Sequence, residues 1–237
     1  MRGLCLLLIA LLGAGVASAD TKHGWTRRVQ GGVNVTEGNK DSTQTRAEIG
    51  ATGRGPGWES ELKLRGDIGE LNSEKNREQV TAEAQFNREI NRLTYMTYRL
   101  DFFYDGIAEI DYRVVLSPSL GRYLVRDDAQ SLRLEGGPAG VVEKKAGERE
   151  AYPALRFAEY YEGRVTKTAR LLQGIEYVPE LRTDVDRYLV KAFVELKSDL
   201  DEQLTLHVRF EGTYDSLPAE GKEEQDTVFS TTLGYRF

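Results

Sequence analysis

Charged side chains recur at every second position in several segments of this chain, and they are its main candidates for chemistry. Around residue 64, for example, Lys63 and Arg65 alternate with Leu62 and Leu64. Successive side chains of a β-strand point to opposite faces, so this spacing separates the charges from the apolar groups. Such charges can select ions in a polar passage, or they can pair and fill it. The candidate lumen charges are Lys63, Arg65, Glu83, Arg99, Asp101, Arg113, Arg209 and Glu211.

His207 is the one residue whose surroundings suggest nucleophilic catalysis. Ser230, in the next alternating segment, is the nearest candidate hydroxyl. A Ser/His/acid set needs these groups within hydrogen-bond reach of one another. The alternation places His207 on the polar, inward face, where a hydrogen-bonded interior histidine is the favoured interpretation. We therefore expect no enzyme; the other histidine, His23, lies in a polar lead where a solvated side chain is expected.

An acidic cluster precedes the last segment, at Glu223, Glu224 and Asp226. Carboxylates of this kind could bind a divalent cation, or bridge lipopolysaccharide through one. A run of charges in a loop is more often simply solvated, and that interpretation is favoured here. No set of His, Asp and Glu has transition-metal spacing, so we expect no metal and no cofactor.

Twelve segments carry the period-two alternation that positions these side chains. An even number of strands returns an up-and-down barrel to the side of the membrane on which it began, as in outer-membrane barrels made of one bacterial chain. In the ninth segment the adjacent Leu171 and Leu172 leave the facing of the side chains undefined. The predicted strands are residues 25–36, 43–52, 58–68, 78–90, 93–104, 110–125, 131–143, 151–161, 166–178, 187–197, 203–214 and 227–237.

The connections between these segments alternate in length and charge along the chain. Odd connections, such as residues 69–78, 144–150 and 215–226, are on the whole longer and more charged, whereas even ones such as residues 53–57 are tight. Short periplasmic turns alternating with longer extracellular loops are typical of outer-membrane barrels.

The chain begins like an exported protein. An apolar run from Leu4 to Leu12 follows Arg2 and precedes the small residues Ala17 to Ala19. This pattern predicts a secretory signal peptide over residues 1–19, handled by the Sec pathway and cleaved after Ala19, and the run is too short to span a bilayer. Residues 20–237 then form one barrel domain. The only cysteine, Cys5, is removed with the signal peptide, so we expect no disulfide.

Composition disfavours nucleic acid as a partner. The full chain has 32 Lys+Arg and 38 Asp+Glu, and loss of Arg2 with the signal peptide leaves a net charge of about −7. Nucleic-acid-binding domains normally carry a basic patch or stripe.

Alternation alone fits either a soluble β-sandwich or a membrane barrel. In a sandwich the apolar faces form a core, but here they contain many small residues, such as Ala82 and Ala84, that would leave such a core thin. Aromatic residues including Trp58, Tyr104 and Tyr160 lie near the predicted strand ends, where they could form girdles at the bilayer interfaces. We therefore predict an all-β fold, an up-and-down antiparallel transmembrane β-barrel of about 12 strands in the bacterial outer membrane.

The last predicted strand places Phe229, Leu233, Tyr235 and Phe237 on one face. This pattern is similar to the C-terminal signature, a final aromatic with alternating apolar residues before it, by which the outer-membrane assembly machinery recognises its substrates. It implies the barrel assembly machinery and periplasmic chaperones as partners during biogenesis.

The middle of the chain, "GIAEIDYRVVLSPSLGRYLV" followed by "SLRLEGGPAG", resembles a bacterial family of salt-induced outer-membrane proteins, a domain family of unknown biochemical function. A weaker likeness extends from Trp25 to Phe237. The resemblance implies a barrel and a link to osmotic or salt response, and no catalytic residue. It is carried by Tyr112-Arg113, Gly121-Arg122-Tyr123, Leu134 to Pro138, Gly31-Gly32 and Asn34.

These observations predict a narrow passive channel for ions or small polar solutes. Three alternatives stay open at this point: a non-conducting structural or envelope-stress barrel, a soluble periplasmic β-protein and, least favoured, a lipid-modifying enzyme. The expected partners in the membrane are outer-membrane lipids and lipopolysaccharide.

Overall fold

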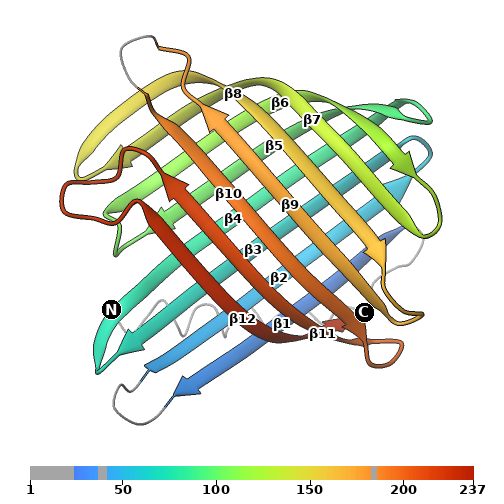
Figure 1. Ribbon diagram of the computed structural model, residues 1–237, viewed down its shortest axis with the longest axis horizontal. Helices are drawn as coiled ribbons and strands as arrows, with labels where there is room; N and C mark the ends of the chain where they lie inside the picture. Colours follow the sequence, from blue (N-terminus) through green and yellow to red (C-terminus); the bar gives the residue numbers. More distant parts are fainter. Residues whose placement is uncertain (1–23, 37–41, 183–185) are drawn as a thin grey trace.

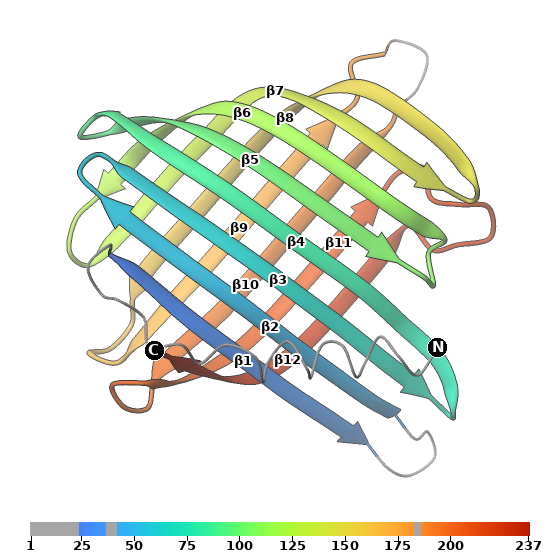
Figure 2. The same cartoon turned by 180° about the vertical axis from the view of Figure 1, so that it is seen from behind.

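Twelve antiparallel strands close into one barrel in the computed structural model, which describes residues 24–36, 42–182 and 186–237. Each strand pairs with the next along the chain and β12 pairs with β1, so the predicted all-β, up-and-down architecture is confirmed (Figures 1 and 2). The strands are β1 (Trp25–Thr36), β2 (Ser42–Gly55), β3 (Trp58–Leu71), β4 (Glu74–Asn91), β5 (Thr94–Asp105), β6 (Ile110–Arg126), β7 (Gln130–Lys145), β8 (Glu148–Arg164), β9 (Ala169–Pro179), β10 (Tyr188–Asp199), β11 (Leu204–Asp215) and β12 (Gln225–Arg236).

The predicted signal peptide, its cleavage site after Ala19 and His23 lie outside the described residues. Within the described residues, no helix is long and apolar enough to cross a bilayer.

The outer surface of the barrel is apolar. Leu62, Leu100 and Phe210 are 47%, 44% and 55% exposed, whereas the inward-facing Arg99 and Asp101 are buried. A soluble sandwich would show the opposite arrangement, with the apolar faces buried and the polar faces in water. An apolar exterior round a polar interior is instead what a barrel in lipid requires. The soluble alternative therefore does not fit this fold.

The hairpins at one end are tighter than the sequence predicts. Residues 69–78 were expected to form a long loop, but β3 and β4 continue to Leu71 and Glu74, and only Asn72 and Ser73 lie between them. Both turn residues have positive φ, 50° and 66°. Two such residues match the twist of the flanking strands, so the charged strands extend up to the turn. The connection at residues 144–150 shortens in the same way.

We call the two ends of the barrel by their connections. The turn end carries the connections after β2, β4, β6, β8 and β10, together with the start of β1 and the end of β12. The loop end carries the other connections, of which residues 180–187 and 216–224 are long.

The ninth strand has a defined facing. Gly174 and Val178 are buried on the inward face, and Ile175 and Tyr177 are exposed on the outer one. The adjacent leucines fit a regular strand, because Leu172 lies on the inward face with Gly174 and Leu171 lies on the opposite face.

The seam between β1 and β12 has the fewest aligned residues of any strand pair in the described part of the chain. Four Cα partners align, from Arg28 to Gly31, whereas β7 and β8 align sixteen. At the turn end, the backbones of Arg27 and Phe237 exchange two hydrogen bonds of 3.2 and 3.1 Å. Just beyond the aligned residues the backbones are close at Gly32, where an added Cβ would lie 2.2 Å from the Thr231 carbonyl oxygen.

Apolar side chains also face the interior near the loop end. Val115, Val141, Ala154, Val178 and Leu189 form a buried cluster there. They share the inward face with buried charges such as Arg113 and Glu143, so apolar and charged groups lie together on the inner wall at this end.

Candidate functional site

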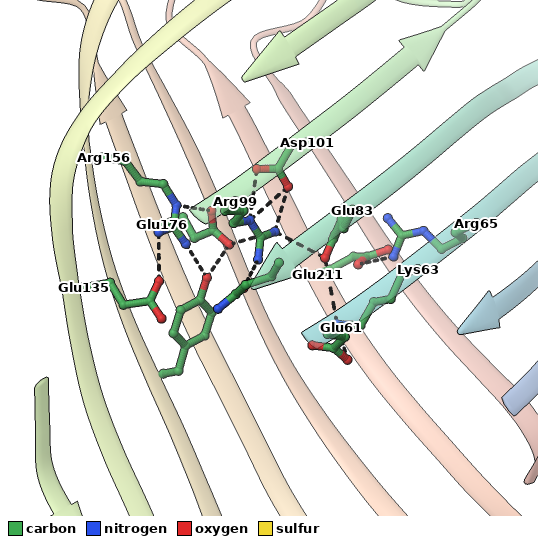
Figure 3. A network of polar contacts seen from close by, with 12 residues as sticks. Glu61, Lys63, Arg65, Glu83, Arg99, Asp101, Glu135, Arg156, Glu176 and Glu211 are labelled. Atoms are coloured by element: carbon green, nitrogen blue, oxygen red, sulfur yellow. Dashed lines mark hydrogen bonds and ion pairs between the residues drawn. The ribbon is translucent and has the colours of Figure 1, made fainter. Parts of the chain in front are cut away.

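All eight candidate lumen charges lie on the inward faces of their strands and make ion pairs. Lys63 Nζ, for example, is 3.8 Å from Glu83 Oε2 on the adjacent strand. Arg209 pairs with Glu211 along β11 at 2.8 Å and with Glu195 of β10 at 2.9 Å. Figure 3 shows six of the eight directed toward one another from β3, β4, β5 and β11.

Arg99 of β5 lies at the centre of the network in Figure 3. Its guanidinium contacts both oxygens of Asp101 at 2.8 to 3.0 Å, and Nη2 is 3.2 Å from Glu83. The same Nη2 reaches Glu176 of β9 at 3.4 Å. Because β5 and β9 are four strands apart, this ion pair crosses the interior.

Arg156 of β8 continues the network. Its side chain pairs with Glu135 of β7 at 2.9 Å and with Glu176 at 3.2 Å, and Nη2 donates to the Tyr160 hydroxyl at 2.6 Å. Tyr95 donates to the other oxygen of Glu135 at 2.7 Å. We call Arg99, Asp101, Glu135, Arg156, Tyr160 and Glu176 the central network.

Burial makes this pairing obligatory. The side chains of Arg156 and Glu135 are 1% and 0% exposed. An unpaired buried charge is costly, and removing one partner of a buried pair typically destabilises a protein by about 3–5 kcal/mol. The central network therefore holds the barrel wall together from within.

A second set of ion pairs lies behind the seam. Arg46 of β2 donates to Asp67 at 2.5 Å, to Glu211 at 2.6 Å and to the Ser230 hydroxyl at 2.9 Å. Its Cα partner on β1 is Gly32, which has no side chain to block the path from β2 to β11 and β12. Arg46 thus connects strands on both sides of the seam.

A third set lies near the loop end. Arg113 of β6 pairs with Glu143 of β7 and with Asp215 at the end of β11, both at 2.5 Å. The pair with Asp215 again crosses the interior.

Two cavities enter the lumen from opposite ends. The turn-end cavity, of about 560 Å³, is lined by polar residues that include Glu59, Asn87 and Arg133, and by Tyr95. The loop-end cavity, of about 110 Å³, has Asp101, Arg156 and Glu176 among its lining residues. Since Tyr95 and Arg156 both contact Glu135, the central network lies between the two cavities.

The inward rows of β3 and β4 remain partly open beside this network. They begin in the turn-end cavity at Glu59 and Asn87. Further along, the side chains of Glu61, Lys63 and Glu83 are 37%, 31% and 26% exposed. Solvent thus reaches charges deep in the lumen on this side.

His207 does not pair with Ser230, whose hydroxyl accepts from Arg46 instead. The histidine lies between Thr205, with Nε2 2.9 Å from Oγ1, and Glu195, with Nδ1 2.8 Å from Oε1. This is the order of a hydroxyl/His/acid set, but Thr205 and His207 are buried and neither lines a cavity described above.

The predicted acidic cluster makes separate contacts. Asp226 pairs with Arg77 at 2.8 Å, and Glu224 accepts from the Tyr214 hydroxyl at 2.5 Å. Among the described residues, no group of three or more His, Cys, Asp or Glu is arranged to hold a metal ion.

Four members of the central network are absent from the candidate set, namely Glu135, Arg156, Tyr160 and Glu176, and two of these omissions have identifiable reasons. Glu176 lies on β9, whose facing could not be assigned from the sequence. Tyr160 was expected in an interfacial girdle, but its hydroxyl points into the lumen and donates to Glu176 at 2.7 Å. Its neighbour Tyr161 takes the outward position, so the strand phase could have separated the two.

A comparison with models of protein families identifies the family of this chain. The model of the family described as "Protein of unknown function, DUF481" matches residues 29–237. The chain belongs to this family. The match says nothing of salt induction, so that part of the resemblance stays a proposal. A search of curated proteins finds no match to the DUF481 barrel.

Solved structures with a similar fold are outer-membrane proteins. The translocator domain of the autotransporter NalP from Neisseria meningitidis has a TM-score of 0.52 and 12% identity, and the match covers 100% of this chain and 96% of that one. The KdgM porin has a TM-score of 0.51 and 11% identity, with 90% and 99% covered. An outer-membrane channel from Pseudomonas putida F1 has a TM-score of 0.51 and 10% identity, with 94% and 98% covered. At these identities the likeness shows the fold alone, a closed barrel of the kind found in outer-membrane proteins.

Proposed function

We propose that the DUF481 barrel is a narrow passive channel for ions or small polar solutes. The observation that carries this proposal is the row of partly exposed charges, Glu61, Lys63 and Glu83, which leads from the turn-end cavity along β3 and β4. Arg99 joins the row to Asp101, which lines the loop-end cavity. A solute would pass beside the central network, and the charges of both signs would set selectivity. The porin and channel folds among the similar structures are consistent with this role.

Conductance of the purified, refolded barrel in a planar bilayer tests the proposal. The expected result is small, ohmic steps at high salt, because the row leaves room only on one side of the lumen. A barrel that shows no conductance, although it migrates as folded protein on an unheated gel, would refute the proposed channel.

The alternative is a non-conducting structural barrel. The ion pairs that cross the interior, such as Arg99 with Glu176 and Arg113 with Asp215, favour it because they fill the lumen. A double variant, Arg99→Ala with Glu176→Ala, separates the two roles. If the natural barrel is silent and this variant conducts, the network is a plug; if both conduct, it is a constriction beside an existing path.

We infer that the barrel is not an enzyme, since the His207 set opens on neither cavity. Incubation with phospholipid vesicles, followed by analysis for released fatty acid, tests this; hydrolysis that His207→Ala abolishes would overturn it.

Export and biogenesis complete the proposal. We infer cleavage after Ala19, contact with outer-membrane lipids and lipopolysaccharide, and help from the assembly machinery and periplasmic chaperones. By analogy with barrels of this class, the turn end faces the periplasm. A link to salt rests on the family resemblance alone, and expression after a rise in external salt is its test.

A further inference from the structure

The loop-end cavity has an apolar wall, which a passage for water alone does not require. Val115, Val178 and Leu189 belong to the buried apolar cluster and also line this cavity. Phe103 adds aromatic surface. Inward-facing residues gain nothing from lipid, so apolar groups here serve either interior packing or contact with the apolar part of a bound molecule.

The cavity is covered by the connection between β11 and β12, residues 216–224. Pro218 and Ala219 line the cavity, and Ala219 is buried although it lies in a loop. The connection is held by three other parts of the chain: Lys145 donates to the Leu217 carbonyl, Lys222 pairs with Glu109 at 2.9 Å, and Ser216 donates to the Asp186 carbonyl at 3.1 Å. These contacts hold the connection, which we call the roof, in place at the loop end of the barrel; Figure 1 shows it between β11 and β12.

The charges round the cavity favour a cation. Seven carboxylates and four basic groups line it, and Arg77 and Arg99 pair with three of these carboxylates from outside the lining, which leaves a formal charge of −1. Most of the carboxylates at its floor are engaged, since Asp101 and Glu176 pair with Arg99. At the roof, the Glu224 carboxylate contacts only the Tyr214 hydroxyl among described residues, and the Glu223 carboxylate contacts no polar partner among them. These two carboxylates can receive a positive group without breaking an existing ion pair.

The volume limits the size of the occupant. An engineered apolar cavity of 150 Å³ binds benzene, so about 110 Å³ beside an open mouth suits one ring or a short alkyl chain. Aromatic faces attract ammonium groups, and the Phe103 ring is one of the lining groups.

We propose that the loop-end cavity binds a small organic cation, with its apolar body against Val115, Val178 and Leu189 and its ammonium group at Glu223 and Glu224. The proposal assigns a class of ligand to the acidic loop. From the sequence pattern alone, this loop either bound a divalent cation or was simply solvated. The inference does not require that the lumen conducts, because the site lies on the loop-end side of the central network.

Isothermal titration of the full barrel in octyl glucoside micelles tests the site. The probes are benzylammonium, benzoate and benzyl alcohol, which share a ring and differ in charge. Benzylammonium is expected to bind saturably at one site per barrel, with benzyl alcohol weaker and benzoate weakest. Equal or tighter binding of benzoate, or no saturable binding of benzylammonium by folded barrel, would overturn the proposal.

Variants in the roof locate the site. Glu223→Gln with Glu224→Gln should weaken benzylammonium binding roughly tenfold, as expected for two partly exposed ion pairs. The control is Glu220→Gln, which removes a charge from the same loop away from the cavity lining. Equal loss in both variants would show a general charge effect and refute the site. Val178→Phe, which fills the apolar wall, should abolish binding of both the cation and the alcohol.

Discussion

Arg46 of β2 and Glu211 of β11 are joined at 2.6 Å, behind the strand pair with the fewest aligned residues. The same guanidinium holds Asp67 of β3 and Ser230 of β12. In hydrocarbon an open strand edge leaves backbone groups unsatisfied, so closure of the barrel is essential. A side chain that bridges a short seam from inside compensates for the few hydrogen bonds between β1 and β12.

Replacement of Arg46 tests this role. Arg46→Met should lower the free energy of unfolding by about 3 kcal/mol, because Asp67 and Glu211 lose a buried partner and keep only Arg65 in common. The measurement is the temperature at which the folded band disappears on a gel. Arg54→Met is the matched control, since Arg54 lies on the same strand but is exposed. Equal loss in the two variants would argue against a bridge at the seam.

Gly32 should be irreplaceable at the same seam. In Gly32→Ala the new Cβ would lie 2.2 Å from the Thr231 carbonyl oxygen, whereas at the adjacent Gly31 the nearest atom is 3.6 Å away. We expect Gly32→Ala to lose about 3 kcal/mol or to fail to assemble, because backbone cannot yield as a flexible side chain does. Gly31→Ala is expected to assemble normally. The yield of folded barrel in the membrane fraction measures both, and the reverse order would contradict the close approach.

Lys63 should influence ion selectivity if the barrel conducts. It lies among Glu61 and Glu83 on the partly open row, at 3.2 and 3.8 Å. Lys63→Glu reverses the only positive charge of that trio, so the reversal potential in a salt gradient should move toward cation selectivity. Lys144→Glu serves as the control because Lys144 pairs with Asp111 away from the lumen row. An unchanged reversal potential in Lys63→Glu would place the conduction path elsewhere.

The ring of Phe237 should matter for assembly more than for conduction. Its backbone exchanges hydrogen bonds with Arg27, and its side chain lies outward and exposed, near Tyr235. Phe237→Ala keeps the backbone bonds and removes the ring, so reduced membrane assembly of this variant would indicate recognition of the side chain. Phe210→Ala, which removes an outward, exposed aromatic from β11 outside the C-terminal pattern, is the control. Normal assembly of Phe237→Ala, with loss only on deletion of residue 237, would assign the effect to the hydrogen bonds.

Much of this fold was accessible from period-two alternation. Lys63 and Leu64 are assigned to opposite faces by adjacency alone, and the same holds for Arg209 and Phe210. The face of a strand depends only on local backbone geometry, which is why the number of strands and the inward charges could be predicted. Alternation failed on β9, where Leu171 and Leu172 are adjacent, and Glu176 was therefore missed. Connection lengths failed for a different reason, because charged residues such as Lys75 and Arg77 can continue a strand beyond the apolar belt.

The partners of each charge were decided only by the tertiary structure. Arg99 could have paired along β5 or with a neighbouring strand, and it also reaches Glu176 four strands away. Contacts across a lumen depend on the tilt, stagger and curvature of the whole barrel, which no local pattern encodes. The same holds for the roof at residues 216–224 and for the bridge from Arg46 to Glu211. The sequence by itself determined which side chains face inward; closure of the barrel decided which of them meet, and so where the lumen is filled and where it stays open.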